Sequence, residues 1–156
     1  MISPPKGLID VENFKIATAE SCTGGLVASR LTDISGASAY VNGGVVAYTN
    51  EIKKSILHVK AETLENFGAV SSQTAMEMAS NVRKIFSATI GLSTTGIAGP
   101  LTSENKPVGL VYVAIVGENF SEVREFHFKG SRTEIKFQAA DEALNLLMQY
   151  VTSAEN

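Results

Sequence analysis

The sequence is poor in the residues that build disulfides and metal centres. Its 156 residues include one cysteine, Cys22, and two histidines, His58 and His127, which lie far apart along the chain. A single cysteine excludes an internal disulfide and any zinc site that needs several cysteines. The histidines belong to no motif with metal-ligand spacing, and no cluster of carboxylates takes their place. The sequence therefore predicts no metal site.

Excess charge of one sign and long apolar runs are also missing. Thirteen basic residues face 16 acidic ones, which gives a formal net charge of −3 and argues against nucleic-acid binding through a broad basic face. The uncharged run 85–103 contains Ser, Thr, Gly and Pro100, so it fits a strand and a loop better than a membrane span. No apolar stretch of the signal-peptide kind follows residues 1–6. We expect a soluble, cytoplasmic protein with no nucleic-acid or membrane partner.

Apolar residues make up 44% of the chain, enough for a substantial core in one domain. We expect a single domain over 1–156 with an irregular segment at 1–12. Apolar and β-branched runs predict strands, and four-three spacing with capping residues predicts helices. The predicted strands are 14–19, 40–48, 88–95, 109–116 and 122–128, and the last two are expected to pair as an antiparallel hairpin. The predicted helices are 26–31, 50–57, 60–67, 72–86 and 133–152, and the last of them carries an apolar stripe that includes Phe137. This alternation predicts an α/β fold: a three-layer sandwich whose mixed, mostly parallel sheet carries helices on both faces.

Ligands of such folds favour the carboxyl ends of strands, which directs attention to residues 20–25, 48–53 and 94–100. The first segment, ESCTGG, is a strand-to-helix turn whose unpaired N–H groups suit an anion or an oxyanion. Ser21 is either a nucleophile exposed on this turn or, with Thr23, only a helix cap. Cys22 is a rival nucleophile, but without an evident histidine partner it is more typical of a small buried thiol.

The second segment offers a phenol, a capping amide and an amine in Tyr48, Asn50 and Lys53. A lysine acts as a general base only where burial or nearby positive charge lowers its pKa, and the alternative is a pair of solvated surface lysines. In the third segment, TTGIAGP, glycines allow the backbone to approach a ligand closely, although a plain turn is equally compatible. Arg132, before the last helix, suits bidentate binding of a phosphate or carboxylate, or is simply solvated.

Several short strings occur in a distinctive order over about residues 14–150. They are ATAESCTGG (17–25), GGVVAYTNEIK (43–53), GAVS (68–71), TGIAGP (95–100), KPVG (106–109) and GSR (130–132). Together they resemble the C-terminal domain of the CinA (competence-damage-inducible protein A) family, which also occurs alone as nicotinamide-nucleotide amidase.

This resemblance implies hydrolysis of the carboxamide of nicotinamide mononucleotide (NMN) to nicotinic acid mononucleotide and ammonia, with no metal or organic cofactor. It implies that Ser21 attacks, that neutral Lys53 moves the protons and that Tyr48 relays or orients them; Ser38 is the reserve nucleophile. A homo-oligomer is also expected. The implied substrate-binding residues are Glu20, Cys22, Thr23, Gly24, Gly25, Ser38, Gly44, Asn50, Thr95, Gly96, Gly99 and Arg132.

The chain also departs from the family pattern. The loop 101–105 is one residue shorter than the family's and lacks its glycines, and His58 stands where glycine is usual. Ser131 replaces a common aspartate and Lys136 a common arginine. Two alternatives therefore stand beside NMN hydrolysis: an amidase for another small carboxamide, and a non-catalytic ligand-binding or protein-interaction module of the same fold.

Overall fold

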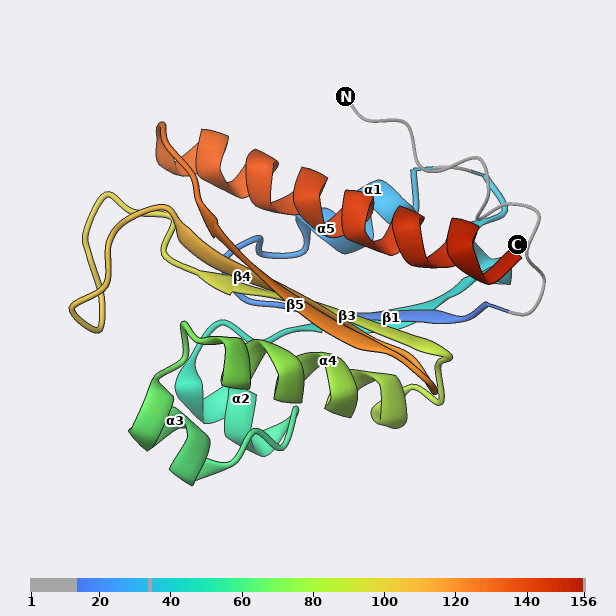
Figure 1. Ribbon diagram of the computed structural model, residues 1–156, viewed down its shortest axis with the longest axis horizontal. Coiled ribbons are helices and arrows are strands. Elements are labelled where there is room, and N and C mark those ends of the chain that lie inside the picture. Colours follow the sequence, from blue (N-terminus) through green and yellow to red (C-terminus); the bar gives the residue numbers. More distant parts are fainter. Residues whose placement is uncertain (1–13, 34, 156) are drawn as a thin grey trace.

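The computed structural model describes residues 14–33 and 35–155, so the irregular segment predicted for 1–12 lies outside the described residues. The α/β fold is confirmed: one five-stranded mixed sheet has helices on both faces (Figure 1). Helices α1 and α5 cover one face, and α2, α3 and α4 cover the other. The strands are β1 (Ile16–Glu20), β2 (Val41–Val46), β3 (Ile90–Gly96), β4 (Leu110–Val116) and β5 (Ser121–His127). The helices are α1 (Leu26–Leu31), the 3-10 turn η2 (Ala37–Ala39), α2 (Asn50–Ser55), α3 (Ala61–Phe67), α4 (Ser72–Ile85) and α5 (Arg132–Glu155).

The strand order is β2-β1-β3-β4-β5. Strand β1 lies parallel to both β2 and β3, whereas β4 is antiparallel to its neighbours β3 and β5. Only β4 therefore runs against the other strands. The carboxyl ends of β1, β2 and β3 meet at one edge of the sheet, which is where the three candidate segments begin.

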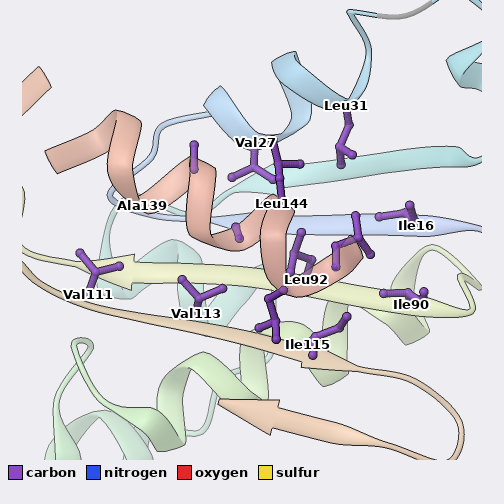
Figure 2. Packing of buried hydrophobic residues seen from close by; sticks show 14 of the residues in the cluster. Ile16, Val27, Leu31, Ile90, Leu92, Val111, Val113, Ile115, Ala139 and Leu144 are labelled. Carbon is purple, nitrogen blue, oxygen red and sulfur yellow. The ribbon is translucent and has the colours of Figure 1, made fainter. Parts of the chain in front are cut away.

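The larger core lies between the sheet and the α1–α5 layer (Figure 2). Ile16, Leu92 and Ile115 of the strands belong to the same buried cluster as Leu144 of α5. On the other face, α4 approaches β3 so closely that a side chain at Gly91 would collide with the Ala79 carbonyl group. Small residues on both elements thus bring α4 close to the sheet.

Three details differ from the sequence-based expectation. Thr49, not Asn50, caps α2, because its Oγ1 accepts a hydrogen bond from the Ile52 N–H at 3.2 Å. Strand β2 ends at Val46 rather than at residue 48, since its partner β1 ends at Glu20. Phe137, expected on the buried stripe of α5, is 46% exposed and lies under the Arg30 guanidinium. None of the described helices is both long and apolar enough to span a bilayer.

Candidate active site

The segments after β1, β2 and β3 meet around one cavity of about 270 Å³. Each of the three strands contributes the residues that follow its carboxyl end, and α5 contributes its first residue. The α3–α4 connection and the loop before β4 complete the wall. The lining residues are Ser21, Cys22, Tyr48, Asn50, Lys53, Ala69, Val70, Thr95–Gly99, Leu101, Ser103, Glu104 and Arg132.

At the base of this cavity lies a serine–lysine pair. The Lys53 Nζ donates a hydrogen bond to the Ser21 Oγ at 3.0 Å, and the two residues are 2% and 8% exposed. Burial lowers the pKa of Lys53 below its usual value of 10.5. The next residue, Lys54, points to the surface, where its Nζ lies 3.6 Å from Glu51. Of the two adjacent lysines, Lys53 is therefore the one with the burial that a neutral amine requires.

The turn that carries Ser21 is held by Glu20, not by a serine or threonine cap. The buried Glu20 carboxylate accepts hydrogen bonds from the Val27 N–H at 2.8 Å, the Ala28 N–H at 3.0 Å and the Thr23 hydroxyl at 2.6 Å. It satisfies the first N–H groups of α1, whose N-cap is Gly25 with no side-chain bond. Glu20 lies outside the cavity lining, so it supports the turn from behind.

Cys22 lies beside Ser21 on the cavity wall but is only 6% exposed. Burial raises the pKa of its thiol to about 12, so the thiolate that a cysteine nucleophile needs is disfavoured. Among the described residues, the backbone N–H groups of Cys22 and Thr23 donate no hydrogen bond to another residue. The N–H of Ser21 itself donates to the Thr94 carbonyl at 3.0 Å, so these two groups are the next donors along the chain from the Ser21 hydroxyl.

Tyr48 and Arg132 lie together at the cavity mouth. Arg132 donates one hydrogen bond to the Tyr48 phenol oxygen and another to the Gly99 carbonyl, both at 2.5 Å. Tyr48 is 56% exposed, and its hydrogen bond with Lys53 is made by its backbone carbonyl, 3.5 Å from Nζ. The phenol therefore pairs with Arg132 and, in the described contacts, bonds to neither Ser21 nor Lys53.

Among the expected substrate-binding residues, the structure places Cys22, Asn50, Thr95, Gly96, Gly99 and Arg132 on the cavity wall. Thr95 donates to the Ala69 carbonyl at 2.8 Å, which ties β3 to the α3–α4 connection. Gly96 leaves no room for a side chain, because a Cβ would lie 2.7 Å from the Leu110 carbonyl oxygen.

The other expected residues lie elsewhere. Thr23, Gly24 and Gly25 line a separate depression beside Lys136 and Phe137. Gly44 lies in the middle of β2, where a side chain would collide with Thr18. Ser38 is in η2, before β2 begins, whereas the cavity lies beyond the end of β2. Six residues of strand span roughly 20 Å, so the reserve nucleophile is at the wrong end of the sheet.

The sequence did not single out Ala69, Val70, Leu101, Ser103 or Glu104 as site residues. The GAVS string and the unusual loop 101–105 were the available signals.

His58 and Glu104 have left-handed backbones with φ of 56° each, and Asn105 has 58°. His58 thus adopts a backbone conformation that favours glycine. No group of three or more potential metal-binding side chains gathers within the described residues 14–33 and 35–155.

Comparison with known proteins gives one consistent result. Residues 6–151 match the CinA C-terminal domain. A relative from Acetivibrio thermocellus, named as a competence-damage inducible protein, is 54% identical over 94% of this chain and 35% of its own length. A CinA-like protein from Syntrophomonas wolfei is 50% identical over 88% of this chain and 33% of its own length. The chain thus spans about a third of these curated relatives.

Solved structures agree with the sequence match. The competence/damage inducible protein CihA from Agrobacterium tumefaciens is 40% identical with a TM-score of 0.85, covering 96% of this chain and 98% of that one. A competence-damaged protein (CinA) superfamily protein from Klebsiella pneumoniae 700603 is 32% identical with a TM-score of 0.90, covering 95% and 92%. The chain belongs to the CinA family, whose C-terminal domain it matches over nearly its whole length.

Proposed function

We propose that this domain is an amidohydrolase that converts NMN to nicotinic acid mononucleotide and ammonia. The observation that carries the proposal is the buried Lys53 Nζ, 3.0 Å from the Ser21 Oγ in a cavity open to solvent. A neutral amine at this distance can accept the hydroxyl proton and activate the serine.

In the proposed reaction, Ser21 Oγ forms a bond to the carboxamide carbon while Lys53 takes the Oγ proton. The backbone N–H groups of Cys22 and Thr23 stabilise the negative oxygen of the tetrahedral intermediate. The intermediate collapses, the C–N bond breaks, and Lys53 returns the proton to the leaving ammonia. Lys53 then takes a proton from water, whose oxygen forms a bond to the acyl carbon. The C–Oγ bond breaks, Lys53 returns the proton to the Ser21 Oγ, and the acid product leaves and ionises to the carboxylate.

Arg132 is the proposed phosphate ligand. Two of its N–H groups are used on Tyr48 and Gly99, so the guanidinium is held at the mouth with donors left for an anion. The resemblance implies that Tyr48 relays or orients protons, and its contact with Arg132 supports a positioning role over a relay. A cytoplasmic location and assembly into a homo-oligomer stay predictions.

The test is ammonia release by the purified protein with NMN, with free nicotinamide as a second substrate and Ser21→Ala as the control. We expect ammonia and nicotinic acid mononucleotide in equal amounts from NMN, and neither from the variant. Ammonia from other carboxamides but not from NMN would identify a different amidase. No ammonia from a panel of carboxamides would leave a ligand-binding or protein-interaction module.

A further inference from the structure

The cavity wall carries two charged side chains of opposite sign besides Lys53. Arg132 supplies a cation at the mouth, held by Tyr48 and Gly99. Glu104 supplies an anion from the loop before β4. Its carboxylate accepts a hydrogen bond from the α3–α4 connection, which is a different part of the wall from the residues that hold Arg132. With Lys53 neutral, as a general base must be, the cavity is dipolar with no net charge.

Glu104 is fixed in place by the backbone of the α3–α4 connection. Its Oε1 accepts a hydrogen bond from the Ala69 N–H at 2.6 Å, and its Oε2 accepts one from the Val70 N–H at 3.2 Å. A Cβ at Gly68 would lie 2.6 Å from Oε1, so the glycine there leaves room for the carboxylate. The Glu104 side chain is 25% exposed, which keeps it accessible from the cavity.

The negative charge of Glu104 is only partly balanced by its neighbour Lys106. The Lys106 Nζ lies 3.6 Å from Oε2 and donates to the carbonyls of Phe67 and Val70 at 2.8 and 2.6 Å. Lys106 is not part of the cavity lining, whereas Glu104 is. The field of the carboxylate reaches the reaction centre, since Glu104 raises the pKa of Lys53 against the larger effect of burial.

We infer that Glu104 is a specificity-determining residue that selects substrates whose amide-bearing ring carries a fixed positive charge. This inference rests on the proposed function, in which the ligand is a pyridinium mononucleotide. Such a ligand is itself dipolar, with a cationic ring and an anionic phosphate, and it matches the Glu104–Arg132 pair. A neutral aromatic amide gains nothing from the carboxylate and loses part of its hydration.

The test compares NMN with its 1,4-dihydro form, which keeps the carboxamide, ribose and phosphate but has an uncharged ring. Binding is measured by titration calorimetry with Ser21→Ala, so that neither ligand turns over. We expect this variant to bind NMN about tenfold more tightly than dihydro-NMN, as one charge contact at a partly solvated site allows. In Ser21→Ala/Glu104→Gln we expect NMN to weaken to the level of dihydro-NMN, whose own affinity stays unchanged.

Glutamine keeps the size of the side chain and an oxygen to accept from the Ala69 N–H, and thermal melting checks that the variant folds. Glu118→Gln, in the turn between β4 and β5, is the matched control and should leave the preference intact. The inference is overturned if Ser21→Ala binds both ligands with equal affinity, or if the preference for NMN survives Glu104→Gln. It is also overturned if Glu104→Gln weakens the binding of both ligands equally. Absence of binding by either ligand would overturn it as well. A charge preference in binding without ammonia release from the wild type would reject the amidase and keep the role of Glu104.

Discussion

Lys53 is a buried amine on a six-residue helix, and its protonation should govern the rate. An ammonium group accepts no proton, so ammonia release from saturating NMN should rise with pH through the pKa of Lys53, which burial sets below 10.5. Replacement by methionine should lower kcat by about 10²- to 10⁴-fold at every pH. An unchanged rate in Lys53→Met across the pH range would remove lysine as the base.

Glu104 should shift that pH profile. Burial lowers the pKa of Lys53, whereas negative charge on Cys22 or Glu104 raises it. The Cys22 thiol stays protonated and uncharged over the working range because its own pKa is about 12, so Glu104 supplies this negative charge. Without the carboxylate the ammonium is less stable, so Glu104→Gln should move the acidic limb of the kcat profile to lower pH. A limb that stays in place or moves to higher pH would show that the charge of Glu104 does not reach Lys53.

The same burial predicts a cost in stability. Because the pKa of Lys53 is lower in the folded chain, the unfolded chain binds more protons between the two pKa values, and stability falls as the pH drops below 10.5. Lys53→Met should therefore raise the free energy of unfolding by about 1 kcal/mol at pH 7, with a smaller gain at pH 10. Urea unfolding at both pH values measures this, and a loss of stability at both would contradict it.

At this scale the sequence strings selected Ser21 and Lys53 as candidates but left their alternatives open. Lys53 and Lys54 differ by about 100° around a helix, so the position of the helix start decides which one faces inward. That start depends on Thr49 rather than on its equally plausible neighbour Asn50. Glu104 was not selected, because its position depends on a loop in which two successive residues adopt left-handed backbones.

At the scale of elements, the turn between β1 and α1 depends on Glu20. Replacing this 1% exposed residue by alanine removes the acceptor of the buried Val27 N–H, the part-buried Ala28 N–H and the Thr23 hydroxyl. We expect Glu20→Ala to lower the free energy of unfolding by about 3 kcal/mol and to lower kcat, because Ser21 loses its support. Glu62→Ala, at an exposed first-turn position of α3, is the control. A change under about 0.5 kcal/mol in urea unfolding would show that the turn holds without Glu20.

Most elements followed from local signals. The spacing of apolar residues predicted α1 and α4, and the alternation in 122–128 predicted a strand that pairs with β4 as a hairpin. Phe137 was misplaced because helical periodicity marks a stripe but does not say where along the helix the neighbouring layer ends. Phe137 lines a depression together with Leu26 and Ser29 of α1, and the Arg30 guanidinium lies over its ring, so the ring faces this depression instead of the core.

At the scale of the molecule, stability should depend mainly on the core between the sheet and the α1–α5 layer. Leu92 is 1% exposed there, so Leu92→Ala should lower the free energy of unfolding by about 2–5 kcal/mol through lost burial and a cavity. Ile85→Ala, at a position 43% exposed at the end of α4, is the matched control with a change below about 1 kcal/mol. Equal losses in the two variants would contradict this account of the core.

The class of the fold was readable from the alternation of elements, but the order β2-β1-β3-β4-β5 was not. Strand order depends on contacts between distant segments, which local patterns do not encode. Ser38 illustrates the consequence: it was expected as the reserve nucleophile, yet it lies before the start of β2 whereas the cavity lies beyond the end of that strand.

The most direct test of the central claim is the initial rate of ammonia release from NMN by Ser21→Ala and Cys22→Ala, measured side by side with the wild type. These neighbours lie on the same cavity wall, and the account assigns the attack to the hydroxyl that bonds to Lys53 rather than to a thiol whose pKa is about 12. It predicts loss of activity in Ser21→Ala and substantial activity in Cys22→Ala. The reverse pattern, or full activity in Ser21→Ala, would contradict it.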